Sequence, residues 1–309
     1  MKLSVVTTLY RSDQTVQEFH RRVALAASEI AAAVEFVYVN DGSPDRSMER
    51  VLHLRSEDPR IVVVDLARNF GHHPALMTGL AVASGDFVFL IDSDLEEPPE
   101  LLLEFWQASR ANPGADAVYG VQMRRKGGLW ERAAGAIWYT LFCRLTRVAY
   151  PPDSLTARLM TRRFVDAALL HKERDLDLMG IFALVGYEQI ALPTTKGSKG
   201  ESAYTLGKRL RIAVTGLTAF TTAPLALIPA AGCLMILLSL AGGVIWLLSS
   251  WVSRGGFSPA SFAVWSIWFV GGLLLSAVGV LALYARAILQ ETKARPRAII
   301  RRIYGSEQS

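Results

Sequence analysis

The sequence predicts an α/β fold in which a doubly wound, mostly parallel sheet is followed by two transmembrane helices. Over residues 2–122, β-rich runs alternate with helical runs, which is typical of parallel sheets whose strands are joined by helices. After Pro224, two long runs carry no charged residue. The mean hydropathy is +0.27 and 51% of the residues are hydrophobic, which is more apolar than a typical soluble domain.

Turn residues and apolar patterning delimit each element of the first part of the chain. Valine-rich runs predict strands, and prolines at 44, 74 and 98–99 stand where they can open helices. The expected strands are residues 2–10, 34–41, 60–67, 86–94 and 115–122, and the expected helices are 14–33, 44–57, 74–84 and 98–110.

Polar clusters follow three of these strands. They read "NDGSPD" at residues 40–45, "RNFGHHP" at 68–74 and "DSDLEE" at 92–97. Parallel sheets of this kind bind ligands at the carboxyl ends of their strands, so we expect the site there. The chain has no P-loop and no G-x-G-x-x-G fingerprint, so a nucleotide would be held in another way.

The acidic cluster directly follows an apolar run. Asp92 and Asp94 are two residues apart, so an extended chain places them on one face, and Glu96 can join them. Oxygen ligands of this kind suit Mg²⁺, which is commonly shared between one or two carboxylates and substrate phosphates. Acids ahead of a helix also complement its dipole. That alternative explains Glu96 and Glu97 equally well, but not the two aspartates.

Two charge-free runs, 225–251 and 257–285, each exceed the roughly 20 residues that cross a bilayer core. They predict a transmembrane hairpin over 224–288, between a cytoplasmic α/β domain at 1–223 and a basic tail at 289–309. Amphipathic stretches at about 128–148 and 206–220 are expected to lie at the membrane interface. The flanking cations predict cytoplasmic termini of an inner-membrane protein by the positive-inside rule: Lys208, Arg209, Arg211, Arg286, Lys293, Arg295, Arg297, Arg301 and Arg302.

The motifs together resemble a known family. "VYVNDGSPDRS", "LARNFGHHPALMTGLAVASGD" and "FLIDSDLEEPPE" are similar to the inverting family 2 glycosyltransferases of the GT-A fold. More narrowly, the chain resembles the polyprenyl-phosphate glycosyltransferases, which include dolichol-phosphate mannose synthase and bacterial undecaprenyl-phosphate enzymes. The resemblance extends to the prolines at 151–152, to Gly200–Tyr204 and to the paired C-terminal runs.

The resemblance implies a nucleotide-sugar donor, which we expect to be a UDP-sugar. Asn40 stands where the family has an acid, so the preference for a base stays open, while Asp41 can accept the N3–H of uracil. The expected donor-binding residues are Thr8, Tyr10, Asn40, Asp41, Arg68, Asn69, His72, Asp92 and Ser93. A gate near the diphosphate is expected at Lys196, Lys199, Ser202 and Tyr204.

The resemblance also implies a divalent cation, Mg²⁺ or Mn²⁺, on Asp92, Asp94 and Glu96. The expected catalytic residues are Asp94, Arg158 and Asp153, although "PPD" can equally be a turn. Thr156 replaces the acid that the family usually has ahead of Arg158, and a threonine is no general base. A phosphate acceptor tolerates that change because its second pKa is about 6, so it is already ionised at neutral pH.

A basic cluster is expected to hold the acceptor phosphate, although a solvated charged face is the alternative: Arg124, Arg125, Lys126 and Arg132. The sequence thus predicts inverting transfer of one sugar to a polyprenyl phosphate at the membrane, with no nucleic-acid partner and with a homo-oligomer left open. Two alternatives remain. One is a processive polysaccharide synthase, disfavoured because no Gln-x-x-Arg-Trp motif is present, and the other is a catalytically weakened membrane scaffold. The sugar itself cannot be read from the sequence.

Overall fold

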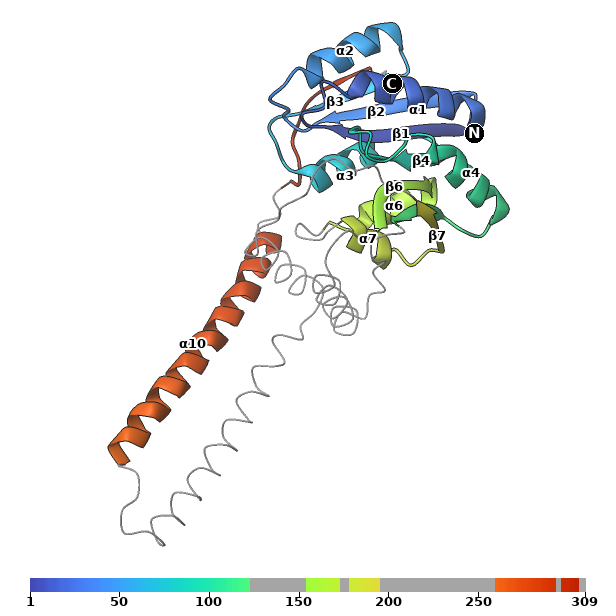
Figure 1. Ribbon diagram of the computed structural model, residues 1–309. Coiled ribbons are helices and arrows are strands. Elements are labelled where there is room, and N and C mark those ends of the chain that lie inside the picture. The colour runs from blue at the N-terminus through green and yellow to red at the C-terminus, as the bar shows by residue number, and fades with distance from the viewer. Residues whose placement is uncertain (123–153, 173–177, 195–258, 293–295, 306–309) are drawn as a thin grey trace. The chain divides into compact units, whose positions relative to one another are not determined.

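The computed structural model describes residues 1–122, 154–172, 178–194, 259–292 and 296–305 (Figure 1). These residues fall into two units. The first is a sheet with its covering helices, and it includes the strand formed by the C-terminal residues. The second contains the helix α10, Pro259–Thr292.

The sheet of the first unit is mixed. Its described strands run in the order β7-β5-β6-β4-β1-β2-β3-β8. Strand β1 pairs in parallel with β2 and β4, β2 with β3, and β5 with β7, whereas β6 is antiparallel to β4 and β5, and β8 is antiparallel to β3. The strands are β1 (Lys2–Leu9), β2 (Ala33–Asn40), β3 (Ile61–Leu66), β4 (Phe87–Leu90), β5 (Ala117–Gln122), β6 (Ser154–Thr161), β7 (Gln189–Thr194) and β8 (Ile300–Tyr304).

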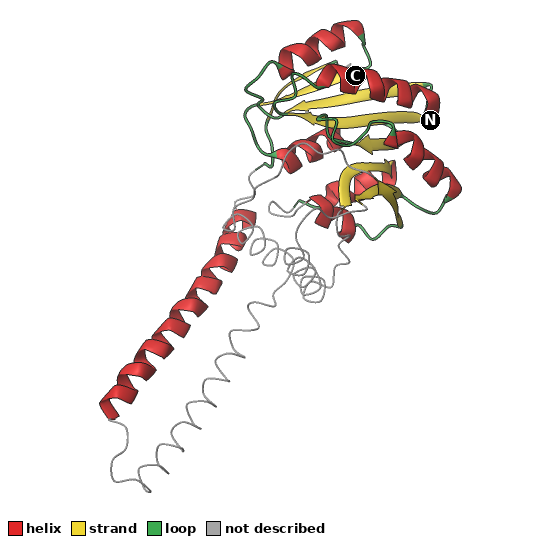
Figure 2. Ribbon diagram, in the orientation of Figure 1, coloured by secondary structure: helices red, strands yellow, loops and turns green. Residues whose placement is uncertain are grey.

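Helices cover both faces of this sheet (Figure 2). The helices α1 (Val16–Ile30), α2 (Ser47–Glu57) and α4 (Leu101–Ala111) pack on one face. The helices α3 (His72–Val82), α6 (Arg162–Leu170) and α7 (Leu178–Leu184) pack on the other. Two apolar cores therefore enclose the sheet, which explains why its central strands read as continuous valine-rich runs rather than as an alternating pattern.

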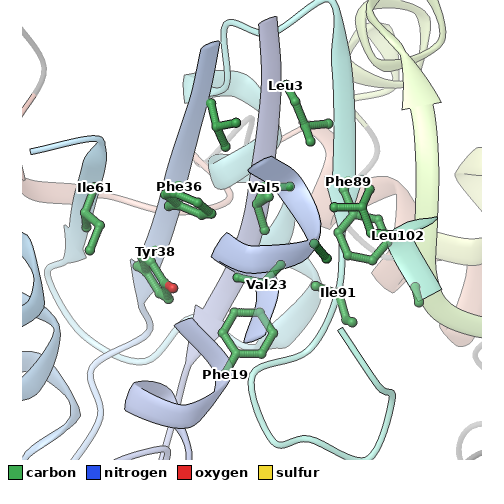
Figure 3. Packing of buried hydrophobic residues seen from close by; sticks show 14 of the residues in the cluster. Leu3, Val5, Phe19, Val23, Phe36, Tyr38, Ile61, Phe89, Ile91 and Leu102 are labelled. Atoms are coloured by element: carbon green, nitrogen blue, oxygen red, sulfur yellow. The ribbon is translucent and has the colours of Figure 1, made fainter. Parts of the chain in front are cut away.

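Alternation along each strand divides its residues between the two cores. Leu3 and Val5 of β1 pack toward α1, where they join Phe19 and Val23 (Figure 3). Val6, the next residue, belongs to the opposite core. All five side chains are at most 1% exposed. Burying an apolar side chain of this size contributes roughly 1.5–3 kcal/mol, so the central strands are firmly fixed.

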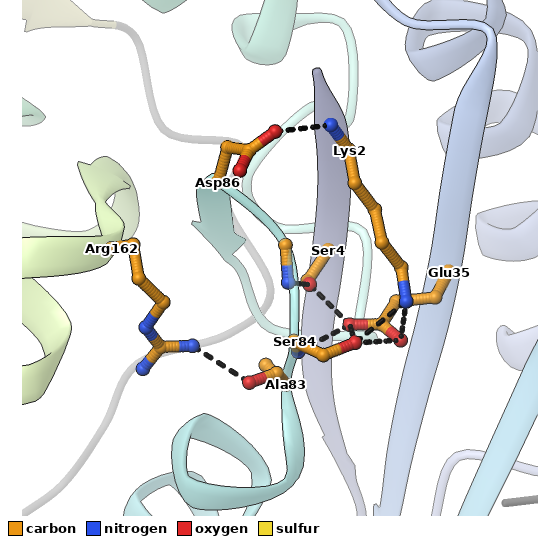
Figure 4. A network of polar contacts seen from close by, with 8 residues as sticks. Lys2, Ser4, Glu35, Ala83, Ser84, Asp86 and Arg162 are labelled. Carbon is orange, nitrogen blue, oxygen red and sulfur yellow. Dashed lines mark hydrogen bonds and ion pairs between the residues drawn. The ribbon is translucent and has the colours of Figure 1, made fainter.

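A polar network closes the amino ends of these strands (Figure 4). The Glu35 carboxylate accepts hydrogen bonds from the Ser4 hydroxyl and, at 2.9 Å, from the Ser84 hydroxyl, and lies 2.8 Å from Lys2 Nζ. Burial opposes its ionisation, but these donors outweigh burial and hold the pKa of Glu35 below its usual value. Gly85 fits tightly here, because a Cβ on it would lie 2.5 Å from Ser4 Oγ.

The α/β character and the five expected strands and four expected helices of residues 1–122 are confirmed, with shifted boundaries. The largest shift concerns the strand expected over 86–94, which ends at Leu90, so that the acidic cluster follows the strand. The sheet is more mixed than expected, since β6 and β8 run antiparallel to their neighbours. Strand β8 lies in the segment expected to be a basic tail.

The expectation of two transmembrane helices is corrected. Across the part of the chain that the structure describes, no helix combines the length and the apolar character needed to cross a membrane. The first expected span, 225–251, lies outside the described residues, as do the stretches expected at the interface, 128–148 and 206–220. The prediction rested on the lack of charged residues along the sequence. That condition is weaker than the requirement that a single helix be both long enough and apolar enough. The expected multi-pass membrane location depended on those spans and falls with them.

Candidate active site at the carboxyl ends of the strands

The carboxyl ends of β1, β2, β3 and β4 meet at one edge of the sheet, because these strands are parallel neighbours. The register places Leu9 beside Asn40, and Asn40 beside Asp65. The chain leaves β4 nearby, where Ile91 N donates a hydrogen bond to Val6 O. All three polar clusters of the sequence, 40–45, 68–74 and 92–97, therefore follow strands that end at this edge.

Asp41 organises the loop that follows β3. One carboxylate oxygen accepts Phe70 N–H at 2.7 Å, and the other accepts Gly71 N–H at 3.0 Å. The residue is buried, and burial raises the pKa of Asp41 above its usual value even though the two N–H groups oppose the change. A carboxylate has about four acceptor positions, so each oxygen keeps capacity for one further donor.

Gly42 allows this loop to approach β2. Its φ is +61°, a conformation that side chains disfavour, and a Cβ there would lie 2.6 Å from Asn69 N. The side-chain amide of Asn69 in turn donates to the backbone oxygen of Asp41 at 3.0 Å. The Asp-Gly pair of the sequence is thus a local requirement for bringing two strand ends together.

Asn40 has both ends of its side-chain amide engaged. Its Nδ2 donates to Asp65 Oδ1 at 2.7 Å, and its Oδ1 accepts Ser43 N–H at 3.1 Å. Because a carboxylate can only accept, Asp65 fixes which end of the amide faces it. An acid at position 40, as the family resemblance would have it, would face Asp65 with a second negative charge, so the asparagine suits this neighbour.

His72 connects β1 to the residues after β4. Its Nδ1 lies 3.2 Å from Thr8 Oγ1, and its Nε2 lies 3.4 Å from Asp92 Oδ1. His73 contacts the neighbouring ring instead, with the two ring centroids 5.6 Å apart. His72, one of the expected donor-binding residues, is therefore the histidine of the pair that contacts both β1 and the residues after β4.

The residues after β4 form a tight turn. Asp94 Oδ1 accepts Glu96 N–H at 2.9 Å, and Leu95 has a φ of +64°. Ser93 is buried and its hydroxyl donates to Thr8 O at 2.8 Å, which ties this turn to β1. Asp92 and Asp94 thus stand on an anchored segment, with part of each side chain accessible.

Glu97 is a residue whose role the sequence did not reveal. Its side chain is 1% exposed, and its carboxylate accepts Ala157 N–H at 2.7 Å and Thr156 N–H at 3.3 Å. It therefore anchors the acidic turn to strand β6. In the sequence, this buried acid looks like the other three acids of residues 92–97, and only the position of β6 distinguishes it.

The described residues do not assemble a closed metal cage. Within the described ranges, no group of three or more histidine, cysteine, aspartate or glutamate side chains could hold an ion. The trio expected with Glu96 is not gathered into such a group among these residues, and its role as a metal site stays a prediction. Asp92 and Asp94 still fit a cation of the Mg²⁺ type, which binds to one or two carboxylates and completes its shell with substrate phosphates and water.

Arg158 lies one strand away from the acidic turn, on β6, where it pairs with Leu90. It is 3% exposed, its guanidinium lies 4.0 Å from the centre of the Phe182 ring, and Nη2 lies 2.8 Å from Met179 Sδ. This places the expected catalytic arginine in an aromatic environment between β6 and α7, and its catalytic role stays a prediction.

Tyr10 and Arg68 lie at the outer margin of the edge. Both are exposed, and the Arg68 guanidinium stacks over Phe70 at 4.0 Å from the ring centre. The other expected residues lie outside the described ranges: Asp153, Arg124, Arg125, Lys126, Arg132, Lys196, Lys199, Ser202 and Tyr204.

The fold and this polar edge define an α/β enzyme whose ligand site lies where the parallel strands end. Residues 4–167 match the family described as glycosyl transferase family 2, and the chain belongs to that family. It is therefore a glycosyltransferase.

Full-length relatives agree with this assignment. A protein of Mycobacterium tuberculosis is 38% identical over 307 residues, which cover 99% of this chain and 90% of the relative. The bactoprenol glucosyl transferase of Shigella phage SfX is 31% identical over 97% of this chain and 99% of its own length. Among solved structures, glucosyl-3-phosphoglycerate synthase from M. tuberculosis, in complex with Mn²⁺ and UDP-glucose, has a TM-score of 0.47 and 19% identity over 70% of this chain and 77% of that one, a likeness too weak to bear on the site.

Proposed function

We propose that the protein transfers a single sugar from a nucleotide-sugar donor to a polyprenyl phosphate, with inversion at the anomeric carbon. The observation that carries this proposal is the meeting of Asn40 and Asp41 with Asp92 and Asp94 at one edge of the sheet, in a family 2 chain. The relatives named bactoprenol glucosyl transferase support the lipid acceptor, since they align over nearly their whole length.

The donor's base and ribose would bind at the ends of β1 and β2. Asp41 keeps one free acceptor position on each oxygen beyond the loop N–H groups it binds, so it can accept a base or ribose donor. Asn40 contributes less freely, because its amide is already held between Asp65 and Ser43. We expect a UDP-sugar, with recognition dominated by Asp41.

The donor's diphosphate would lie beside Asp92 and Asp94. A bound Mg²⁺ or Mn²⁺ would supply positive charge to the leaving diphosphate. Asp92 and Asp94 would hold that ion, and His72 keeps Asp92 oriented by its contacts to Asp92 and Thr8. Ser93 and Glu97 hold the segment in place from behind, through β1 and β6.

The transfer itself is a direct displacement. An oxygen of the acceptor phosphate forms a bond to the anomeric carbon while the bond from that carbon to the donor diphosphate breaks, which releases a nucleoside diphosphate. The acceptor oxygen is already ionised near neutral pH, so no side chain needs to take a proton. This agrees with Thr156, a half-buried threonine whose backbone N–H binds Glu97. Arg124, Arg125, Lys126 and Arg132 remain the proposed phosphate-binding cations.

The test is a transfer assay with purified protein, a short-chain polyprenyl phosphate in detergent and a panel of radiolabelled nucleotide sugars. The proposal expects label in the lipid from one donor, one sugar per lipid and inverted anomeric configuration. A long polymer would support the processive alternative instead. No transfer from any donor, under conditions where the protein stays folded and Mg²⁺ and Mn²⁺ are supplied, would contradict the proposal.

A further inference from the structure

We infer that the C-terminal strand β8 is part of the donor site's support, and that Arg301 is the positioning residue through which it acts. This inference rests on the proposed function, since it concerns how the proposed base-binding residues are held. The sequence assigned β8 to a basic tail, yet the strand lies directly beside β3. It contacts Asp65 and Ala67, and these connect it to Asn40 and to the loop that binds Asp41, the residues proposed to contact the donor.

The first connection runs from Arg301 to Asn40. Arg301 Nη1 lies 3.3 Å from Asp65 Oδ2, and the other oxygen of Asp65 accepts Asn40 Nδ2 at 2.7 Å. The Asp65 side chain is only 7% exposed. One carboxylate thus joins the C-terminal arginine to the base-binding asparagine, and its orientation determines how Asn40 presents its amide.

The second connection runs from Arg301 to Asp41. Arg301 Nη2 donates to Ala67 O at 2.7 Å, and Ala67 N–H donates to Ile299 O at 2.8 Å. Ala67 is the last residue before the loop whose N–H groups bind the Asp41 carboxylate. The C-terminal segment therefore fixes the start of that loop from the side opposite to Asp41.

The strand itself is well fixed. It pairs with β3 from Val63 to Leu66, and the chain after Tyr304 turns at Gly305 with a φ of +92°. A Cβ at Gly305 would lie 2.7 Å from Ile61 O, so only glycine allows this close approach. Arg301 is thus held in reach of Asp65 by the backbone and not by its own ion pair.

Because the backbone holds Arg301 in place, the effect of its side chain on donor binding can be measured separately from its effect on stability. The Arg301 side chain is 62% exposed, and exposed ion pairs contribute little to folding. Losing Arg301 should therefore leave the fold intact while it loosens Asp65, Asn40 and the loop after Ala67. The effect should fall on donor binding and not on the acceptor.

The experiment compares Arg301→Ala and Arg301→Lys with Arg302→Ala, a matched control on the same strand whose guanidinium stacks on Tyr304 at 4.8 Å from the ring centre. The readouts are the KM for the donor, the KM for the polyprenyl phosphate, and the Kd for UDP by calorimetry. Arg301→Ala should raise the donor KM and the UDP Kd by about tenfold, the size of one lost charge-assisted hydrogen bond. The donor KM and the UDP Kd of Arg301→Lys should lie between those of wild type and Arg301→Ala, since an ammonium group cannot match the two-pronged hydrogen bonding of a planar guanidinium. The lipid KM and the Arg302→Ala variant should remain unchanged.

Combining Arg301→Ala with Asn40→Ala separates positioning from general loosening. If Arg301 acts through Asp65 on Asn40, its effect should shrink in the Asn40→Ala background, whereas independent effects would add. Equal UDP affinity in Arg301→Ala and wild type would overturn the inference, as would full additivity. If the Tm of Arg301→Ala is well below that of wild type, the UDP affinity of Arg301→Lys is compared with wild type instead. Equal UDP affinity in Arg301→Lys and wild type would then overturn the inference. Failure of wild type to bind UDP or any other nucleoside diphosphate would instead contradict the proposed function.

Discussion

The two ends of the central strands place acids in opposite situations. At the amino ends, Glu35 is surrounded by Lys2, Ser4 and Ser84, and these donors lower its pKa. At the carboxyl ends, Asp41 is held by two backbone N–H groups, and burial raises its pKa. Folding favours the ionised form of the first acid and disfavours that of the second.

The difference separates a structural acid from a candidate site acid. At the amino ends, the hydrogen-bond donors of the network occupy the acceptor positions of the Glu35 carboxylate, so none is left for a ligand. The carboxyl-end acid is buried and its pKa is raised, yet it keeps acceptor capacity to spare. Burying it lowers stability but prepares a binding position. Perturbed acids with spare capacity are common at functional sites, whereas saturated ones are common in structural networks.

The largest expected effect tests the carboxyl end. Asp94→Asn or Asp92→Asn should lower kcat by at least about a hundredfold, because each removes a charge that would hold the cation beside the leaving diphosphate. Glu35→Gln, which removes an acid at the amino end, should leave kcat within about twofold. Steady-state kinetics with saturating donor and thermal melts on all three variants make the comparison. Similar kcat losses in Glu35→Gln and Asp94→Asn would erase the distinction between the ends.

A smaller effect is expected when the loop-organising acid is removed. Asp41→Ala leaves the N–H groups of Phe70 and Gly71 without their acceptor, which should lower the free energy of unfolding by about 1–3 kcal/mol and raise the donor KM. Urea unfolding and donor kinetics measure the two consequences. The role assigned to Asp41 fails if the donor KM stays at the wild-type value in folded protein.

The amino end should show itself in the pH dependence of stability. Because the pKa of Glu35 is lowered on folding, its contribution is fully present above its ordinary value of 4.5 and is lost as pH falls through the lower pKa of the folded protein. Glu35→Gln should therefore unfold about 1–2 kcal/mol more easily near neutral pH, with the difference shrinking in acid. Urea titrations between pH 3 and 7 test this, and a difference that grows in acid would contradict the assignment.

Asp41 should oppose that trend. Its pKa is raised on folding, so its contribution is present below its ordinary value of 3.8 and is lost as pH rises through the higher folded pKa. The stability of Asp41→Ala relative to wild type should thus improve as the pH rises through that range. The same urea titrations, applied to this variant, provide the measurement, and a constant difference across the series would show that burial does not perturb Asp41.

The smallest expected effect concerns Thr156. Thr156→Ala should change kcat by less than about threefold, because the backbone N–H, and not the hydroxyl, binds Glu97, and because an ionised phosphate needs no base. Glu97→Gln is the informative partner, since it weakens the hold on β6. A Thr156→Ala defect as deep as that of Asp94→Asn would show that the threonine takes part in the chemistry.

The sequence was a good guide where the pattern is local. Alternating strands and helices predicted the β1 to β5 region, and the positions of Asn40, Asp41, His72 and Asp92 after strands predicted their meeting at one edge. Local pattern could not show where distant segments pair. Arg301 reaches Asp65 only because β8 joins β3, and Glu97 acts only because β6 lies beside it.

The same limit explains the wrong prediction of membrane-spanning helices. The charge-free runs after Pro224 are a property of composition, and the described residues contain no helix that meets the requirements of a membrane crossing. Glu96 was expected to join the two aspartates where the chain turns after the strand, and its role as a third metal ligand stays a prediction. The strand ends at Leu90, Asp94 accepts Glu96 N–H, and no group of three such side chains among the described residues could hold an ion.

The central claim is that the carboxyl ends of the strands hold a nucleotide together with a divalent cation. Calorimetric titration of UDP into wild type, Asp92→Asn and Glu35→Gln, each with Mn²⁺ or with chelator, tests it most directly. We expect UDP binding to depend on Mn²⁺ in wild type and in Glu35→Gln, and to be lost or at least about tenfold weaker in Asp92→Asn. Equal UDP binding by all three proteins, with or without the cation, would contradict it.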